Sequence, residues 1–326
     1  MKMITRRDWL KGLSFLAADG LLGCNTIRFV AGGTVEIDPN LSVFISDTHV
    51  KADGFQLEYF HRCVNDILEL SPRPANVICF GDIAHLHGKI EDYRASEPDF
   101  RRLMAAGIKV TFGMGNHDVR AAFADVWPES VADSLVPGQV VHEVNLGYCD
   151  LIMLDTLHEM DETATPNNRL NGWIGSGQLK GAQFEWLKAE AVRRKRPFLL
   201  GAHHIIHEIT DGDSNAINDV AVMTPNCLGW VHGHDHTWKN RVVMQSGKEW
   251  WRDITPRKRV LGLPSTGHFG DIGYAICRTY PDRVTVDLVE TDHFFPAPEN
   301  RTAIDLDIIA EHQHQRVTFR YPTTSL

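Results

Sequence analysis

Five short polar motifs, each directly behind an apolar run of strand-like composition, constrain this chain more than any other feature of its sequence. The motifs are Asp47-Thr48-His49, Gly81-Asp82, Gly115-Asn116-His117-Asp118, His203-His204 and Gly233-His234-Asp235-His236. The runs ahead of them are Leu41–Ser46, Val77–Phe80, Ile108–Phe112, Phe198–Ala202 and Leu228–Val231. Open α/β folds bind their ligands in a crevice outside the ends of their strands. The ordered set therefore predicts one site built from strand ends.

The motifs carry seven side chains that can bind metal ions. Three offer oxygen, four offer imidazole nitrogen and none offers a thiolate. These side chains are Asp47, His49, Asp82, Asn116, His203, His234 and His236. Such a mixture suits Fe, Mn, Zn or Co, whereas Mg and Ca prefer oxygen alone. Two ions about 3.5–4 Å apart can hold both the attacking and the leaving oxygen of a phosphoryl displacement. A carboxylate reaches two ions at once, so we expect one Asp to bridge them.

The ordered motifs resemble those of the calcineurin-like metallophosphoesterase superfamily, and in pattern they are similar to the bacterial class III cyclic-nucleotide phosphodiesterases. The resemblance implies an α/β fold in which two mixed β-sheets form a four-layer αββα sandwich. It also implies that Asp82 bridges two divalent or trivalent transition metals. The remaining ligands divide between the ions, with Asp47, His49 and His236 on the first and Asn116, His203 and His234 on the second. A hydroxide shared between the metals would then attack phosphorus in line.

His117 stands between an expected ligand, Asn116, and a second carboxylate, Asp118. The family pattern makes His117 a non-ligand and implies that it is the general acid, which protonates the departing alkoxide. We expect Asp118 to hold the His117 ring in the required tautomer, as carboxylates near metal sites often do. The alternative is that both residues cap the helix expected near Val119–Asp125.

Other histidines have more than one interpretation on sequence alone. His203 is favoured over His204 as the ligand, because relatives carry the ligand first in a His-His-Pro-Pro sequence, although both prolines are absent here. His85 and His87 either line the substrate pocket or lie in a loop without a function. His268 is either near the site or structural.

One catalytic domain is expected over residues 24–326, because motifs that span residues 47–236 must meet in space. Helical periodicity fits Phe55–Leu70, Pro98–Ala106 and Gln178–Arg194. Further strands are expected at Val140–Asn145, Leu151–Leu154, Val242–Gln245, Lys258–Leu261, Ile272–Cys277, Val284–Val289 and Val317–Tyr321. This pattern fits two stacked mixed sheets flanked by helices.

Residues 1–23 have the features of an export signal. Arg6 and Arg7 precede a weakly apolar stretch, which resembles a twin-arginine signal. The stretch is short and is interrupted by Asp19, so it does not fit a membrane-spanning helix. The sequence that ends at Cys24 resembles a lipobox, which implies that Cys24 is acylated and holds a periplasmic or extracytoplasmic lipoprotein at a membrane. The alternative is a signal cleaved elsewhere, with a chance cysteine.

The formal net charge of the chain is −9. Residues 1–23 carry four basic and two acidic side chains, so their removal changes the charge to −11. An acidic body repels a polyanion, which disfavours long nucleic acid as a partner. Metal ions still provide a local positive charge for a small phosphate ester, the substrate class expected here.

Three functions are compatible with these residues. The favoured one is dinuclear-metal-dependent hydrolysis of phosphodiesters or phosphomonoesters. A second is a pyrophosphatase that cleaves nucleotide-sugar or nucleotide-lipid anhydrides. A third, non-enzymatic function is a surface lipoprotein that binds a phosphorylated ligand through a decayed site. The complete set of ligand positions, together with His117, weighs against decay.

Overall fold

The computed structural model describes residues 36–159, 175–179, 181–209, 217, 220–221, 224–243, 258–293 and 316–322. The chain divides into two units, Met1–Glu36 and Ile37–Leu326. The expected export signal, with Arg6, Arg7 and Cys24, lies outside the described residues. Within the described part of the chain, no helix has the length and apolar character that a membrane span requires.

The first of two six-stranded sheets has the strand order β12-β11-β10-β1-β2-β3. Its strands are β1 (Ile37–Ile45), β2 (Arg73–Cys79), β3 (Lys109–Phe112), β10 (Asp271–Thr279), β11 (Arg283–His293) and β12 (Arg316–Arg320). β1, β2 and β3 are parallel, whereas β10, β11 and β12 add to the sheet in antiparallel pairs. The sheet is therefore mixed, and the three parallel strands end at the same edge.

The second sheet has the order β4-β5-β6-β7-β9-β8. Its strands are β4 (His142–Asn145), β5 (Asp150–Met153), β6 (Phe198–Ala202), β7 (Cys227–His232), β8 (Lys239–Val243) and β9 (Lys258–Gly262). The four central strands are parallel, and β4 and β8 pair antiparallel at the edges. β8 begins three residues before the expected strand Val242–Gln245, and residues 244–257, which follow it, lie outside the described part.

The helices are α2 (Phe55–Leu68), α3 (Ile90–Ala105), α4 (Arg120–Val126), α5 (Pro128–Ala132), α7 (Gly181–Arg193) and the 3₁₀ helix η1 (Ile206–Glu208). The expected start of a helix at Pro98 was wrong, because α3 begins eight residues earlier and contains Pro98. Its buried side chains Tyr93, Ser96, Phe100 and Leu103 follow the helical period on both sides of the proline. Burial of this stripe offsets the hydrogen bond that Pro98 cannot donate.

The side chains of β6 show how the layers stack. Leu199 packs in the apolar core shared by the two sheets, together with Phe44 of β1. Leu200 points to the opposite face, where it packs with Leu187 of α7. On the far side of the first sheet, Phe100 of α3 packs on Phe112 of β3, with ring centroids 4.8 Å apart.

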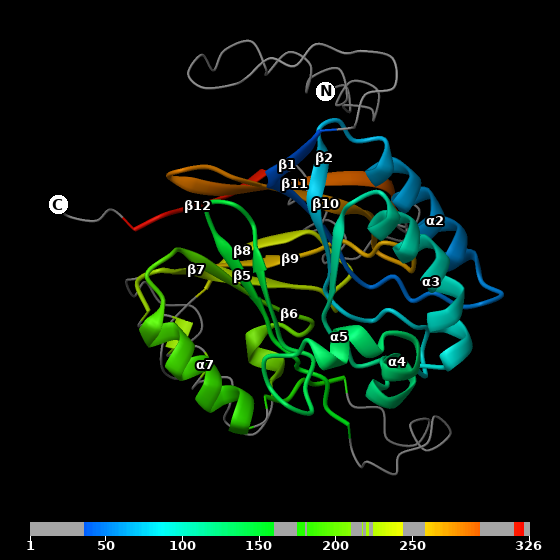
Figure 1. Cartoon of the computed structure of the whole chain (residues 1–326), viewed down its shortest axis with the longest axis horizontal. Coiled ribbons are helices and arrows are strands. Elements are labelled where there is room, and N and C mark those ends of the chain that lie inside the picture. The colour runs from blue at the N-terminus through cyan, green and yellow to red at the C-terminus, as the bar shows by residue number, and fades with distance from the viewer. Residues whose placement is uncertain are drawn as a thin grey trace, which may run out of the picture. The chain divides into compact units, whose positions relative to one another are not determined.

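Figure 1 shows the same order of layers, with α2 and α3 on one side of the paired sheets and α7 on the other. The four-layer αββα sandwich expected from the sequence is confirmed.

Candidate metal centre

Backbone hydrogen bonds hold the polar motifs together where the strands end. The N–H groups of Asp47 and His49 donate to the carbonyl oxygens of Gly81 and Asp82, at 3.1 and 2.9 Å. These bonds join the loops behind β1 and β2. A side chain behind the second sheet reaches the first sheet, because Nδ1 of His203, which follows β6, lies 2.9 Å from the carbonyl oxygen of Phe80, which follows β2. The predicted meeting of strand ends therefore spans both sheets.

Five of the expected ligands have a strained backbone. Asp47, His49, Asp82, His234 and His236 have φ values of 52°, 41°, 50°, 67° and 53°. Among the described residues they are the only non-glycine positions with positive φ. This left-handed conformation costs roughly 1–2 kcal/mol per residue. Such strain collects at functional sites, where the surrounding structure holds it.

The first metal group consists of Asp47, His49, Asp82 and His236, which are all buried. Nε2 of His236 lies 3.2 Å from Oδ1 of Asp47 and 3.1 Å from Nε2 of His49. Nε2 of His49 lies 3.4 Å from Oδ2 of Asp82. Two imidazole nitrogens and two carboxylate oxygens converge on one point, which is a donor set for a transition metal.

The second metal group lies on the other side of Asp82. Nε2 of His203 is 3.2 Å from Oδ2 of Asp82 and 3.0 Å from Oδ1 of Asn116. Nδ1 of His234 is 2.9 Å from the same Asn116 oxygen. Asp82 Oδ2 therefore neighbours both groups, as a bridging carboxylate must. The structure brings all seven expected ligands together.

His203 is better placed than His204 to be the ligand. The Phe80 carbonyl oxygen accepts from Nδ1 of His203, which leaves Nε2 directed at Asp82. Nδ1 of His204 instead lies 2.8 Å from the Thr156 hydroxyl. The His204 ring still packs beside His203 and His234, with centroids 4.9 and 5.0 Å away. His204 therefore lies beside the second group, with one ring nitrogen within 4.8 Å of those of His203 and His234.

The buried carboxylates of Asp82 and Asp47 favour a positive charge on the group beside them. Burial lowers the pKa of His203, but the carboxylates of Asp82 and Asp47 outweigh it and raise that pKa to about 10. Burial lowers the pKa of His234 to about 4, and the charge on His203 adds to the effect. A proton on His203 thus occupies the place that a metal ion would take. Metal binding displaces this proton, so it weakens as pH falls.

His117 lies beside the two groups with a defined orientation. Its Nδ1 is 3.0 Å from the Leu86 carbonyl oxygen, which can only accept, so Nδ1 carries a hydrogen. Its Nε2 is 4.0 Å from Oδ2 of Asp82. The ring therefore presents Nε2 to the bridging carboxylate and to any group that binds there.

Asp118 does neither of the things expected from the sequence. Its Oδ1 accepts from the N–H groups of Ile83 and Ala84 and from the Tyr93 hydroxyl, and its Oδ2 accepts from the N–H of Gly115. The N-cap of α4 is Val119, without a side-chain hydrogen bond. Burial and the nearby Asp82 raise the pKa of Asp118 to about 6. Asp118 positions the ligand loops, and the Leu86 carbonyl group orients His117 in its place.

The first metal group has two further contacts: His268, which the sequence left as either near the site or structural, and Phe269, which the sequence did not indicate. The Phe269 ring packs on His236, with centroids 4.2 Å apart, yet 56% of Phe269 is exposed. The His268 ring lies 4.4 Å from that of His49. Neither residue follows a strand in the manner of the five motifs. Only the packing of the loop between β9 and β10 shows their position.

The profile of the calcineurin-like phosphoesterase family matches residues 42–238, which contain every expected ligand. The chain belongs to this family. The resemblance seen in its motifs is confirmed. The candidate ligands fit divalent metal cofactors, because buried oxygen and imidazole donors converge on the two sides of Asp82, beside His49 and beside His203.

A probable cyclic nucleotide phosphodiesterase from Rhodopseudomonas palustris is 33% identical to this metallophosphoesterase over 172 residues. The match covers 50% of this chain and 56% of that protein, so the chain spans about half the length of this relative.

Two solved structures share the fold. A dimetal phosphatase from Danio rerio superposes with a TM-score of 0.62 at 15% identity, over 87% of this chain and 100% of that one. A purple acid phosphatase from yellow lupin, Lupinus luteus, gives a TM-score of 0.53 at 10% identity, over 87% of this chain and 54% of that one.

The shared position of Asp82 leads to a prediction about metal content. Asp82→Ala is expected to lose both ions, because its Oδ2 is the atom that neighbours both groups. His49→Ala is expected to weaken mainly the first ion. Inductively coupled plasma mass spectrometry of the purified variants measures this, with thermal unfolding as the check that each variant folds. Full occupancy in Asp82→Ala would refute the bridging role.

Proposed function

We propose that this metallophosphoesterase hydrolyses small phosphodiesters or phosphomonoesters at a dinuclear centre, with His117 as the general acid. The observation that carries the proposal is the position of Asp82 Oδ2, 3.4 Å from His49 Nε2 and 3.2 Å from His203 Nε2. His117 Nε2 reaches the same oxygen at 4.0 Å. The two groups of metal donors and the His117 ring, which is not an expected ligand, therefore all lie around Oδ2 of Asp82.

The side chains divide the work between holding ions and moving a proton. A pair of bound metal ions supplies Lewis-acid stabilisation of the phosphoryl group and acidifies water. The first ion would be held by Asp47, His49 and His236, and the second by Asn116, His203 and His234, with Asp82 common to both. The buried carboxylates of Asp47 and Asp82 would offset the positive charge of the two ions, so that the centre is stable in the protein interior.

His117 is suited to protonate the leaving oxygen of the ester. The Leu86 carbonyl group accepts from Nδ1, so this nitrogen keeps its hydrogen when His117 acts as an acid. The second proton is then on Nε2, the nitrogen that faces Asp82. Transfer of this proton to the departing alkoxide leaves a neutral His117 that carries its hydrogen on Nδ1. A proton taken from solvent restores the acid.

Apolar side chains border the centre and favour a substrate with an organic group. Phe269 is 56% exposed and packs on the ligand His236. Leu86 is 42% exposed, and its carbonyl group contacts His117. An ester whose organic part lies against these side chains would keep its phosphoryl group over the ions. The name of the Rhodopseudomonas relative adds support for a diester among such substrates.

The role of His117 predicts a dependence on the leaving group. His117→Ala is expected to keep both ions and to lose roughly 10²–10⁴-fold in rate on alkyl phosphodiesters, the usual contribution of general acid–base catalysis. The loss should be much smaller on bis(p-nitrophenyl) phosphate, because nitrophenolate leaves without a proton. Steady-state kinetics with metal analysis tests this, with His87→Ala as the control in the neighbouring loop. Loss of metal in His117→Ala would identify it as a ligand and contradict the assignment.

We also propose that the enzyme is exported by a twin-arginine route and anchored through a lipid on Cys24. The basis is sequence alone: the Arg6-Arg7 pair and the lipobox-like sequence that ends at Cys24. Cys24→Ser is expected to prevent acylation and to leave the hydrolase activity intact, because Cys24 lies outside the motif set. Mass spectrometry of the mature protein tests this. An unmodified Cys24 preceded by intact residues 1–23 would contradict it.

A further inference from the structure

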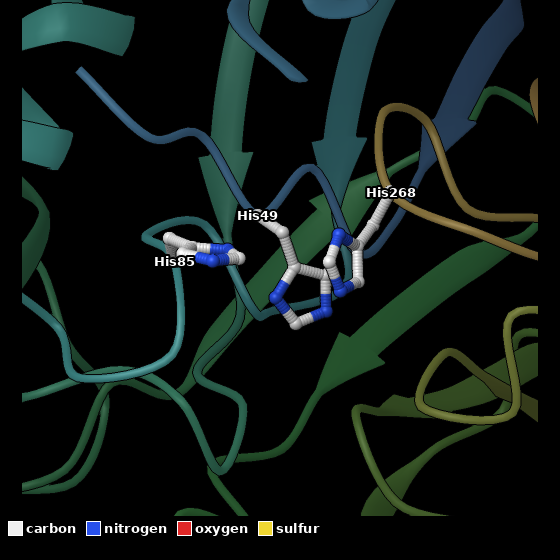
Figure 2. Close-up of side chains that lie close together, drawn as sticks. All are labelled: His49, His85 and His268. Carbon is white, nitrogen blue, oxygen red and sulfur yellow. The ribbon is translucent and has the colours of Figure 1, made fainter. Parts of the chain in front are cut away.

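Three imidazole rings form a separate cluster beside the first metal group. His49, His85 and His268, called here the auxiliary cluster, each place one ring nitrogen within 4.8 Å of the others. Figure 2 shows the three rings close together, each carried by a different loop. The ring centroids of His49 and His268 are 4.4 Å apart, and those of His85 and His268 are 5.3 Å apart. Of these rings, the dinuclear centre uses only His49.

Two nitrogens of the auxiliary cluster are buried without a partner. Nδ1 of His49 and Nδ1 of His85 make no hydrogen bond within the described part of the chain. Buried polar atoms in folded proteins nearly always have a partner, so an unpaired buried nitrogen needs an explanation. A bound metal ion would provide a partner for both nitrogens. His49 can serve two neighbours, because its Nε2 faces Asp82 while its Nδ1 is the unpaired atom.

Hydrogen bonds connect His268 to the segment that carries Asp47 and His49. The backbone N–H of His268 donates to Oγ of Ser265 at 2.9 Å, and that hydroxyl donates to the Asp47 carbonyl oxygen at 2.8 Å. Nδ1 of His268 lies 3.3 Å from the Gln56 side chain. Metal-binding histidines commonly have such a second hydrogen-bond partner, which fixes the ring.

The backbone of His85 is fixed in the same way. Its N–H donates at 3.0 Å to the carbonyl oxygen of Val50, the residue directly after His49 in the chain. This bond fixes the His85 backbone beside His49, so the side chain of His85 starts close to the other two rings. The backbones of His85 and His268 are thus both tied to the segment that carries Asp47 and His49.

We propose that the auxiliary cluster binds a third metal ion beside the dinuclear centre. The ligand class is a divalent transition-metal cation such as Zn²⁺. Three imidazoles with an open fourth position are an established donor set for Zn²⁺, and imidazole nitrogen also suits Cu²⁺ and Ni²⁺. When His49 binds ions through both nitrogens, its remaining ring proton passes to solvent. The proposal adds a site to the proposed dinuclear function, and its test counts ions instead of turnover.

The test is the zinc content of the full chain after saturation with Zn²⁺ and gel filtration, measured by inductively coupled plasma mass spectrometry. The wild type is expected to retain three ions per chain. His85→Gln and His268→Gln, which keep the size of the side chain without the imidazole, are expected to retain two. His87→Gln is the matched control in the His85 loop and is expected to retain three. Thermal unfolding confirms that each variant folds.

The outcomes separate the auxiliary site from the dinuclear centre. Two ions in the wild type and in every variant would overturn the auxiliary site and leave the dinuclear centre intact. Three ions in the wild type and in both cluster variants would also overturn it, because the third ion would then lie elsewhere. Two ions in the wild type and one in both cluster variants would keep the auxiliary site and count against the dinuclear centre.

Discussion

The buried carboxylate of Asp82 is the group on which the rest of the centre depends. Its Oδ2 neighbours His49 and His203, and its Oδ1 accepts from the N–H of His117 at 2.8 Å. A Cβ atom on Gly115 would lie 2.2 Å from the same Oδ1, so only glycine fits there. An anion in the protein interior is costly unless cations and hydrogen bonds surround it. The surrounding imidazoles, and the ions they can bind, meet that requirement.

The two sheets make this arrangement possible by holding strained loops in place. Five ligands adopt a left-handed backbone conformation that their loops alone would not maintain. The loops follow strands that are buried in the apolar core shared by both sheets, where Phe44, Phe80 and Leu199 pack together. Rigid strands fix where each loop begins, and hydrogen bonds between loops fix where each ligand points. The packing of the apolar core thus maintains the geometry of the centre.

The sequence predicted the parts of the centre that depend on strand order. Each motif directly follows a strand, and the ends of parallel strands meet, so the seven ligands could be named before their distances were known. Other contacts depend on groups that no pattern marks. The Leu86 carbonyl group orients His117, and a main-chain oxygen has no sequence signature. The expectation for Asp118 came from its neighbour in sequence, whereas its partners are backbone N–H groups of the ligand loops and the Tyr93 hydroxyl of α3. The meeting of His85 and His268 depends on a loop between β9 and β10 that lies far along the chain.

The central claim is that one oxygen of Asp82 joins two metal ions. The most direct measurement is a crystal structure of the metal-loaded enzyme, with anomalous diffraction collected on both sides of the absorption edge of the metal. The account predicts two anomalous peaks about 3.5–4 Å apart, with Asp82 bound to both ions, and a separate third peak beside His85 and His268. A single peak between Asp47 and His236, or two peaks of which only one contacts Asp82, would contradict it.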